Sequence, residues 1–540
     1  MAARPDIAVA VSRALSSMGI DVPATSVHLE RPARRDHGDW STNTALANAK
    51  ALGRPPRQIA EELAEHLRTD PPPHLESVDV AGPGFVNLHL SPGWLHDTLR
   101  AVVGEGESAY ARNEIGAGEK VQIEFISANP TGPVHVGNGW WGAYSDAMGR
   151  VMTRCGWQVH REYYVNDTGG QIRALGESLL ARRRGDAVPE EGYQGEYVAE
   201  LASGYDGPEE VESAGRWAAE RILDNIRGTL RRLGMVFDEW YSQASVEESG
   251  AVRDTIELLA GKGLVDEEDG AVWFRSSRLG DNRDRVLMKS NGDATYLAGD
   301  LAYHRDKFLV RKFDRVIDIF GADHAGQVKS LMLGVEAMGV EPGRLEVKLG
   351  QMVSLVQGGQ AGRMSRRAGN FVALDELIDD IGADATRLLS LMSSLDQAAV
   401  LDLDLVRSQS MENPVYYVQY AHARIASIER RRVERGIDRH PLEAVDLSLL
   451  VHDRELELLR SLEELPDVVA EAGRDRAPHK VTAWVRSLAG AFHGFYHDCP
   501  VLAETVSDEL TQARLWLVEA ARVGLGIGLD ILGVSAPESM

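Results

Sequence analysis

The spacing of hydrophobic residues changes character twice along this chain. In the first part, helical spacing over Ile7–Met18 and Ile59–Leu67 is followed by two apolar strands around a Gly-Pro-Gly turn within Val78–Leu90. A Pro-Pro pair breaks the chain just before the second helix. These elements predict a small N-terminal α/β domain over residues 1–108.

The middle part, residues 109–395, alternates β-rich strands with helical runs. Strands are predicted at 121–126, 157–165, 315–320 and 345–350. This alternation indicates a parallel, doubly wound (Rossmann-like) sheet covered by helices. A helix-rich, acidic insertion is expected to interrupt it at about 170–290, and the Arg182–Arg184 run inside the insertion is expected to be a solvated face.

The last part, residues 396–540, has helical spacing almost throughout. Helices are predicted over Leu456–Leu465, Val481–His497 and Leu510–Leu532. Because proline lacks the N–H group that a helix interior needs, Pro466 is expected to end the first of these helices. The acidic join at Asp396–Asp404 is expected to be a loop, and the whole part an all-α helical bundle.

Composition narrows the class of protein. At 540 residues the chain is long enough for more than one buried core, and its two cysteines exclude a disulfide framework and a cysteine-rich zinc site. So few cysteines suit a reducing, cytoplasmic setting, and no apolar run is long enough to span a membrane. The net charge of −24 argues against indiscriminate nucleic-acid binding, so we expect no DNA and no membrane partner. A specific RNA can still bind local basic patches.

A long, shaped loop follows the first strand of the middle part. It reads I-S-A-N-P-T-G-P-V-H-V-G-N from Ile126 to Asn138 and leads into a helical run. His135, Gly137 and Asn138 fall at the predicted helix start, where unpaired backbone N–H groups and the positive end of the helix dipole favour an anion. A glycine there lets a flat ligand approach, so the loop predicts a site for a nucleotide with its polyphosphate.

The same letters also spell a dinucleotide fingerprint. Gly137, Gly139 and Gly142 make G-x-G-x-x-G, and Glu162 follows about twenty residues later. The fingerprint needs its first glycine directly after the strand, and the bulky tryptophan pair within this match would crowd a pyrophosphate. We therefore discount it.

Two acidic motifs are candidates for a cationic ligand. Glu124 lies inside an apolar strand, where a carboxylate is costly unless it is paired; taken alone, it fits an edge strand with Glu124 facing water. In Y-L-A-G-D, a helix would place Tyr296 and Asp300 on one face. The alternative is an N-capping Asp300 beside a packing Tyr296.

Two further motifs are candidates for a nucleotide. Gly321 and Asp323 follow a strong strand, where an acid can bind a ribose, although Asp323 also fits a helix N-cap. The stretch G-R-M-S-R-R-A-G-N over 362–370 places three arginines between glycines, and such a cationic loop can offset charge that develops during phosphoryl or nucleotidyl transfer. A basic surface loop is the alternative. Since no P-loop motif occurs, these groups and the His135 helix start would have to hold the phosphates.

The loop R-P-A-R-R-D-H-G-D-W in the N-terminal part combines basic residues with a tryptophan. Arg34, Arg35 and Trp40 could grip and stack a nucleic acid. A solvated loop with one buried tryptophan is at least as compatible with the sequence.

Together these motifs resemble the class I aminoacyl-tRNA synthetases. H-V-G-N corresponds to that class's HIGH signature and R-M-S-R-R to its KMSKS loop. The chain resembles the arginyl-tRNA synthetase family more closely still. Four blocks occur in that family's order, namely E-F-I-S-A-N-P-T-G-P-V-H-V-G-N, Y-L-A-G-D, G-A-D-H-A-G-Q and N-P-V-Y-Y-V-Q-Y-A-H-A-R-I. The likeness covers essentially the whole chain.

The resemblance implies ATP-dependent attachment of L-arginine to tRNA(Arg) through an arginyl-adenylate, with Mg²⁺ and with no covalent enzyme intermediate. It implies an N-terminal domain that contacts the tRNA elbow, a class I catalytic domain and a C-terminal anticodon-binding domain. We expect a monomer. The alternatives are another class I synthetase or a non-catalytic tRNA-binding paralogue.

The resemblance also assigns roles to single residues. Catalysis is assigned to His135, Asn138, Arg363, Arg366 and Arg367. ATP binding is assigned to Pro133, His135, Gly137, Asn138, Gly321, Asp323, Met352, Val353, Met364 and Ser365. Arginine binding is assigned to Glu124, Ser127, Asn129, Tyr296, Asp300 and Gln327. Contacts with tRNA are assigned to Arg34, Arg35, Trp40, Tyr417, Tyr420 and Arg424, and no residue is assigned as a resident metal ligand.

Two departures from the family pattern stand out. Asn138 replaces the last His of the first signature, and it can donate a hydrogen bond but carries no charge. Arg363 and Arg366 replace both lysines of the second signature, which keeps the charge on a wider group. The four-three-four spacing of Asn413, Tyr417, Tyr420 and Arg424 predicts one helical face, either for stacking on bases or for packing the bundle.

Overall fold

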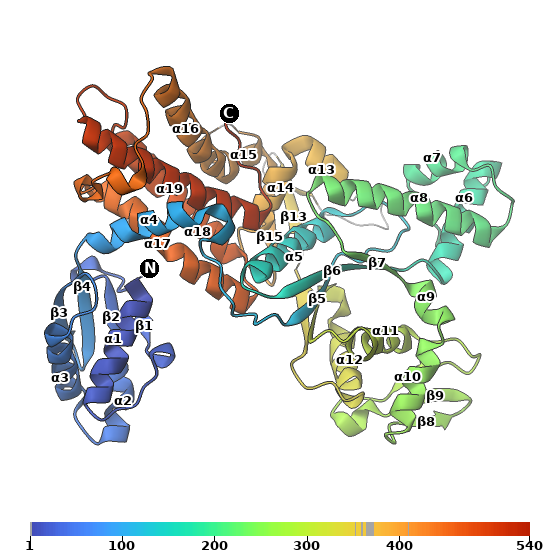
Figure 1. The fold of residues 1–540 in the computed structure, drawn as a ribbon. Helices are drawn as coiled ribbons and strands as arrows, with labels where there is room; N and C mark the ends of the chain where they lie inside the picture. Colours follow the sequence, from blue (N-terminus) through green and yellow to red (C-terminus); the bar gives the residue numbers. More distant parts are fainter. Residues whose placement is uncertain (1–2, 352, 358–359, 363–371, 409) are drawn as a thin grey trace.

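The computed structural model describes residues 3–351, 353–357, 360–362, 372–408 and 410–540. Figure 1 shows three parts: an N-terminal domain, a central sheet with its insertions, and a bundle of long C-terminal helices beside the sheet. Six predicted site residues lie outside the described residues, namely Met352, Arg363, Met364, Ser365, Arg366 and Arg367.

The N-terminal domain is the α/β unit that the sequence predicts. Its elements are α1 (Ala3–Ser17), β1 (Leu29–Glu30), β2 (Trp40–Thr42), α2 (Thr44–Leu52), α3 (Pro56–Thr69), β3 (Leu75–Ala81) and β4 (Phe85–Leu90). The strands form an antiparallel sheet in the order β1-β2-β4-β3. Ile59, Leu63 and Leu67 lie at helical spacing on α3 and are fully buried, because α3 packs against β3 and β4.

Helix α4 (Gly93–Ala109) leaves this domain. It packs against α17 (Asp453–Asp475) and α19 (Asp508–Leu532), two helices of the C-terminal bundle, and Figure 1 shows it alongside them. The expected boundary near residue 108 therefore falls at the end of a helix that packs with the last part of the chain.

The central sheet is parallel and doubly wound, as predicted. Its strands are β5 (Lys120–Glu124), β6 (Gln158–Val165), β7 (Glu239–Ser242), β11 (Arg315–Gly321) and β12 (Leu345–Gly350). They lie in the order β12-β11-β5-β6-β7, and every neighbouring pair is parallel. The strand order reverses between β5 and β11, and ligands of such sheets bind beyond the carboxyl ends of the strands at that point.

The expected helix-rich insertion at about 170–290 is only partly helical. Helices α6 (Gly170–Arg184), α7 (Glu196–Gly204) and α8 (Val211–Arg232) come first, and Arg182–Arg184 is exposed as predicted. The chain then returns to the main sheet as β7, and α9 (Gln243–Glu248) and α10 (Ala251–Ala260) follow. A small antiparallel sheet closes the region, with β8 (Val265–Glu268), β9 (Ala271–Phe274) and β10 (Arg285–Met288). The sequence conceals β7 because its four residues are all only half-buried.

The expected loop at Asp396–Asp404 is also wrong. The structure has β15 (Ala399–Asp402) there, paired in parallel with β13 (Val353–Gln357), and then α15 (Leu403–Arg407). Between β13 and β15 lie β14 (Gln360–Gly362), α13 (Leu374–Ile381) and α14 (Ala383–Ser390). Of the four residues in β15 only Leu401 is fully buried, so the hydrophobic pattern is too weak to reveal a strand.

Four long helices form the predicted C-terminal bundle. The prediction that Pro466 ends a helix is wrong. The four helices are α16 (Pro414–Glu434), α17, α18 (His479–Asp498) and α19, and α17 runs through Pro466. A proline at this position leaves the carbonyl of Leu462 without its helical N–H donor. The hydroxyl of Tyr110 donates to that carbonyl at 3.0 Å. A side chain from just beyond α4 therefore replaces the missing backbone bond.

A buried guanidinium joins the bundle to the central sheet. Arg387 on α14 donates to the Asp146 carboxylate at 2.6 Å and to the backbone oxygens of Leu233 at 2.7 Å and Leu532 at 2.9 Å. Asp146 lies on α5 (Val136–Arg154), and Leu532 ends α19. One side chain thus ties together α5, α14, α19 and the residue that follows α8.

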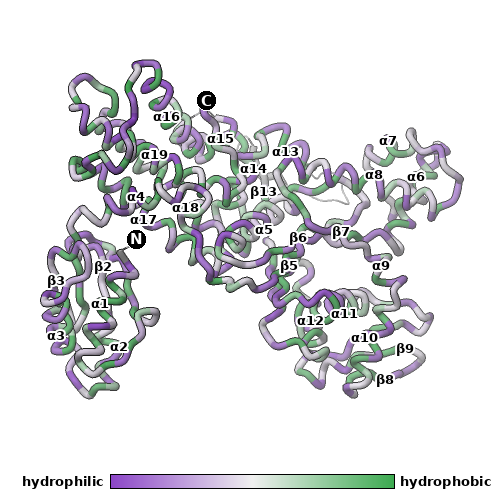
Figure 2. Tube along the Cα trace, in the orientation of Figure 1, coloured by the Kyte–Doolittle hydropathy of each residue, from purple (hydrophilic) through white to green (hydrophobic). Residues whose placement is uncertain are grey.

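Hydrophobic and hydrophilic residues alternate along most of the chain in Figure 2. Among the described helices, none combines the length and the apolar composition needed to cross a lipid bilayer.

Candidate active site

The predicted helix start is confirmed. His135 caps α5, and its Nδ1 accepts a hydrogen bond from the backbone N–H of Gly137 at 2.9 Å. Asn138 lies half-buried in the first turn, and Pro133 is half-buried in the loop before it. The dipole and the remaining N–H groups of this helix start favour an anionic ligand.

The backbone before α5 pairs with the segment that follows the second signature. Leu374 donates to the Val134 carbonyl at 2.8 Å, and His135 and Ala373 form an antiparallel bridge. The residues just before α13 are thereby fixed beside the first signature.

Close packing explains the glycines that mimic a dinucleotide fingerprint. A Cβ on Gly139 would lie 2.5 Å from the side chain of Leu374, and one on Gly142 would lie 2.6 Å from Ile126. These glycines are therefore needed for contacts between α5 and its neighbours, which supports discounting the fingerprint.

The turn after β5 is strained and held by side chains. Ile126 and Ser127 have φ values of 69° and 38°, in the left-handed region that non-glycine residues avoid. Ser127 Oγ donates to Glu124 Oε1 at 3.0 Å and accepts from the Tyr164 N–H at 3.1 Å. Asn129 donates to Gln171 Oε1 at 2.6 Å. Such strain persists only where the surroundings enforce it, and here it aims Ser127 at Glu124.

Four carboxylates form a row across the sheet. The register pairs Asp318 with Glu124, Glu124 with Glu162, and Glu162 with Glu239 on four adjacent strands, and we call these four residues the acid row. Glu124 therefore lies on the central strand of the sheet, so the alternative of an edge strand facing water is wrong. Like charges side by side destabilise a sheet unless cations compensate them.

Cations of one helical segment pair with the acid row. Helix α11 (Tyr296–Arg305) continues into a π-turn, η4 (Asp306–Val310). Lys307 Nζ lies 2.6 Å from Glu124 Oε2 and 2.9 Å from Asp318 Oδ1. Arg311 donates to Glu162 at 2.9 Å and to Glu239 at 3.1 Å. These partners could not be found from the sequence pattern, because Lys307 lies 183 residues from Glu124 along the chain.

Burial and charge shift the pKa values of this group. Burial opposes the charged form of Asp318, but Lys307 and His304 outweigh it and lower the pKa of Asp318 to about 2. Burial raises the pKa of Glu124, although Lys307 pulls in the opposite direction. Despite burial, the two carboxylates raise the pKa of Lys307, so the ammonium stays charged.

Asp300 lies beside this group on α11. Its neighbour His304 donates from Nδ1 to the Asp300 backbone oxygen at 2.7 Å, and its Nε2 is hydrogen-bonded to Asp318 Oδ2 at 2.7 Å. The Asp300 carboxylate forms no hydrogen bond or ion pair with any residue that the structure describes, and burial raises its pKa to about 6. The N-cap of α11 is Thr295, so the alternative of a capping Asp300 is wrong. Tyr296 is 72% exposed at the start of the same helix.

The remaining described candidates, three for ATP (Gly321, Asp323 and Val353) and one for arginine (Gln327), lie at or after the ends of strands β11 and β12. Gly321 ends β11, Asp323 lies in the short turn η5 (Ala322–His324), and Gln327 is exposed in the first turn of α12 (Ala325–Ala337). Val353 is buried at the start of β13. These residues surround the carboxyl ends of the strands where the strand order reverses.

Two residues of the acid row and a neighbouring histidine form a cluster that could suggest a metal site. His160, Glu162 and Glu239 bring ligand atoms within 4.8 Å of one another. Arg311 pairs with both carboxylates, so the residues do not fit a resident cation.

The residues assigned to tRNA are only partly exposed. Arg34 and Arg35 are exposed, but Trp40 is 1% exposed in β2, so the indole cannot stack on a base in this structure. Arg31 covers the Trp40 ring at 4.2 Å and pairs with Glu463 of α17. The loop thus agrees with the alternative of one buried tryptophan.

The residues predicted to share one face of α16 do not all do so. Asn413 is a buried N-cap that accepts from the Val415 N–H at 3.0 Å, so it does not share an exposed face with the tyrosines. Arg424 lies 4.4 Å from the Tyr420 ring, and Tyr417 packs edge-on against His493 of α18. These contacts favour bundle packing for Tyr417.

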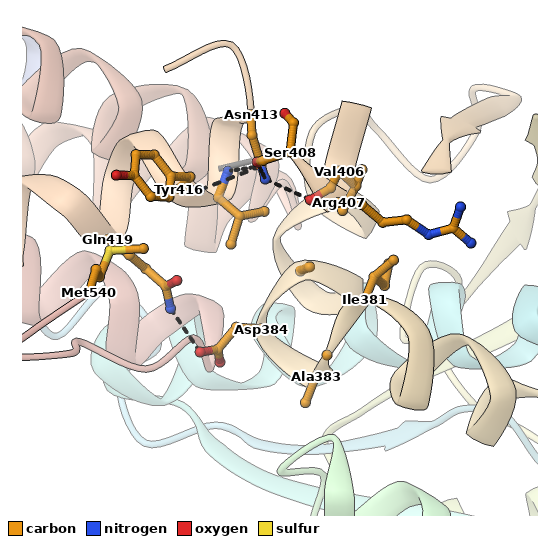
Figure 3. A pocket seen from close by; sticks show the side chains of 13 residues that line it. Ile381, Ala383, Asp384, Val406, Arg407, Ser408, Asn413, Tyr416, Gln419 and Met540 are labelled. Atoms are coloured by element: carbon orange, nitrogen blue, oxygen red, sulfur yellow. Dashed lines mark hydrogen bonds between the residues drawn. The ribbon is translucent and has the colours of Figure 1, made fainter. Parts of the chain in front are cut away.

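A hollow of about 420 Å³ lies where the bundle meets the catalytic part (Figure 3). It is lined from α14 to α16 and by Met540, and Gln419 donates to Asp384 across it at 2.8 Å. Among the described residues, none that is assigned to ATP or arginine lines this hollow.

Comparison with known proteins decides the family. Curated arginine–tRNA ligases are 44% identical to this chain in Carboxydothermus hydrogenoformans, over 95% of this chain and 94% of the relative, and 44% identical in Frankia alni, over 99% and 98%. The chain belongs to the arginyl-tRNA synthetase family.

Family models match in the same order as the structural parts. The model described as the arginyl-tRNA synthetase N-terminal domain matches residues 5–90, the class I (R) catalytic domain matches 196–427, and the DALR anticodon-binding domain matches 418–540. The expected class I fold is thereby confirmed.

Solved structures agree on the fold. Arginyl-tRNA synthetase of Thermus thermophilus is similar with a TM-score of 0.79 at 24% identity, over 99% of this chain and 100% of that chain. A methionyl-tRNA synthetase of Mycobacterium tuberculosis is similar with a TM-score of 0.55 at 14% identity, over 77% and 92%. This second likeness concerns the fold alone.

Proposed function

We propose that this chain attaches L-arginine to tRNA(Arg) in two ATP-dependent steps. The arginine carboxylate attacks the α-phosphorus of ATP in line, which gives arginyl-adenylate and pyrophosphate. The 2′-hydroxyl of the terminal tRNA ribose then takes the arginyl group. The observation that carries this proposal is the buried carboxylate of Asp300, which has no hydrogen bond or ion pair among the described residues and lies beside Glu124 and Asp318, on the two strands between which the strand order reverses. The capped start of α5, which suits phosphates, follows the strand of Glu124 along the chain.

The arginine pocket is formed around the buried carboxylates of the site. A guanidinium is planar and permanently charged, so it is best bound by carboxylates in a fork. We assign this role to Asp300 and Glu124, with Tyr296 along the side chain. Ser127 orients Glu124, while Asn129 and Gln327 hold the α-amino and carboxylate groups.

The nucleotide uses the helix start and the ends of the strands. His135 and Asn138 flank the phosphates, Pro133 and Gly137 leave room for the adenine, and Gly321 and Asp323 hold the ribose. Met352 and Val353 line the adenine, and the loop with Arg363, Met364, Ser365, Arg366 and Arg367 offsets phosphate charge. Positioning and charge stabilisation carry the chemistry. Mg²⁺ would be bound largely through the ATP phosphates, since the four carboxylates of the acid row are paired with Lys307 and Arg311.

The outer domains are assigned to the tRNA. The N-terminal domain contacts the elbow through Arg34 and Arg35, and the DALR domain reads the anticodon near Tyr420 and Arg424. We propose a cytoplasmic monomer. Both cysteines are free and buried, which suits a reducing compartment, and sedimentation of the purified protein tests the oligomeric state.

One assay tests the activity. Purified protein is incubated with ATP, Mg²⁺, tRNA(Arg) and labelled arginine, and arginyl-tRNA is expected. Labelled lysine and methionine are the controls, and neither should be attached. Absence of arginyl-tRNA together with intact tRNA binding would identify a non-catalytic paralogue.

A further inference from the structure

The acid row needs internal cations, and the short π-helix η4 together with Arg311, the residue that follows it, supplies them. Lys307 pairs with Glu124 and Asp318, and Arg311, four residues later, pairs with Glu162 and Glu239. π-Turns are rare and often lie at functional sites. Here the turn η4 directs both cations at the same face of the sheet.

Lys307 is the more deeply buried of the two. Its side chain is 0% exposed, while that of Arg311 is 19% exposed. Its ammonium lies 4.2 Å from the centre of the Tyr303 ring, so an aromatic face closes the side that faces neither carboxylate. A buried lysine held in this way cannot leave the site to make room for a substrate cation.

The contacts of Glu124 show what Lys307 does for the pocket. One carboxylate oxygen faces Lys307 and the other accepts from Ser127. Both oxygens are thus fixed in place before any ligand arrives. Asp300, one helical turn before His304, keeps its carboxylate unpaired among the described residues.

We propose that Lys307 is a positioning residue of the arginine pocket, which fixes the Glu124 carboxylate and cancels charge beside it so that Asp300 remains for the substrate guanidinium. This inference rests on the proposed pocket for arginine. It assigns Lys307 no contact with ATP or with the reacting atoms.

Removing the ammonium should alter arginine use selectively. Lys307→Met keeps the length of the side chain and removes its charge. Glu124 then lies buried near Asp318, Asp300 and His304 without its cation, so its pKa rises further and its protonated form is favoured. The KM for arginine should rise at least about tenfold at pH 7, while the KM for ATP stays within about twofold.

The pH dependence separates positioning from a general structural defect. Raising the pH from about 7 to about 8.5 should lower the arginine KM of Lys307→Met toward the wild-type value, because Glu124 loses its proton again. The wild-type arginine KM should stay flat over this range. An unchanged arginine KM, or equal rises in both KM values without a pH trend, would overturn the proposal.

Two further variants keep the test decisive. Lys307→Met/Asp318→Asn removes one cation and one carboxylate together, so it should fold even if the single variant does not, and its arginine KM should still rise. A native arginine KM in a folded double variant would refute the role of Lys307. Lys312→Met, at an exposed neighbouring lysine, is the matched control and should behave as wild type.

Asp300→Asn distinguishes this proposal from the pocket on which it rests. If Asp300→Asn raises the arginine KM and Lys307→Met does not, only the role of Lys307 fails. If Asp300→Asn leaves the arginine KM unchanged, the pocket itself is wrongly placed.

Discussion

The two halves of the acid row are built alike but differ in what they leave unpaired. Arg311 joins Glu162 to Glu239 and also pairs with Asp306. Lys307 joins Glu124 to Asp318 in the same manner, yet Asp300 stands beside this half without a partner among the described residues.

The pKa values express this difference. Burial works against the charged form of Glu162, but hydrogen bonds from His160 and Arg311 hold its pKa well below the ordinary value. Burial raises the pKa of Asp300 to about 6, and the nearby charges of Glu124 and Asp318 act in the same direction, against His304 and Lys307. A buried charge alone is therefore not the sign of a site; the uncompensated carboxylate is.

The largest effect is expected from the unpaired carboxylate. Asp300→Asn removes the charge that the guanidinium needs, so arginylation at low arginine concentration should fall by about 10²- to 10³-fold. Steady-state kinetics with varied arginine measure this, and tRNA binding should be intact. Near-normal arginylation would reject the pocket.

A substitution in the half of the acid row held by Arg311 should lower the stability of the protein and leave arginine use largely unchanged. Glu162→Gln leaves Arg311 short of its main partner inside the sheet, so the free energy of unfolding of the catalytic domain should fall by about 3 kcal/mol. Denaturant titration followed by tryptophan fluorescence measures the loss. A raised arginine KM together with an unchanged free energy of unfolding would contradict the division between the two halves.

The pH dependence of arginine binding follows from the raised pKa. Because the acid form of Asp300 is favoured in the folded protein, the folded state loses stability as the pH rises from the ordinary carboxyl range through about 6. A guanidinium prefers the ionised form, so arginine affinity should rise about tenfold per pH unit below pH 6 and level off above it. Calorimetric titration of arginine measures this, and a flat profile in Asp300→Asn is the control.

The smallest effect is expected from an uncharged group, the Leu462 carbonyl, which also needs a hydrogen-bond partner when it is buried. Tyr110→Phe removes the donor to the Leu462 carbonyl, which Pro466 cannot supply, and should cost about 1 kcal/mol of unfolding free energy. Adding Pro466→Ala restores a backbone N–H and should recover most of the loss. Thermal melting of the single and double variants measures the coupling, and purely additive effects would argue against it.

The sequence predicted the architecture well because long periodic segments carry a strong signal. The doubly wound sheet, the capped start of α5 and the long helices of the bundle were all predicted. Short, half-buried strands such as β7 and β15 were missed, because their stability comes from pairing with neighbours and not from their own pattern. The prediction that Pro466 ends a helix was wrong for a similar reason, since a tyrosine distant in sequence donates the hydrogen bond that the proline cannot.

The candidate site was predicted in kind but not in detail. An acid such as Glu124 inside an apolar strand implied a partner, and motif resemblance supplied Asp300. Neither identified Lys307, because the register of four strands brings the acids together and a π-turn sets the lysine against them. Only the three-dimensional structure shows which acid is left over.

The bonds of Arg387 have a mechanical consequence. Its guanidinium is bonded to α5 at one side and to the last residue of α19 at another, and it is 1% exposed. Helix α5 and the end of α19 are thus bonded to one planar group. Displacing the two helices relative to each other by more than the tolerance of a hydrogen bond must break buried bonds. We therefore expect α5 and α19 to move as one unit, so that a shift of one helix is accompanied by a shift of the other.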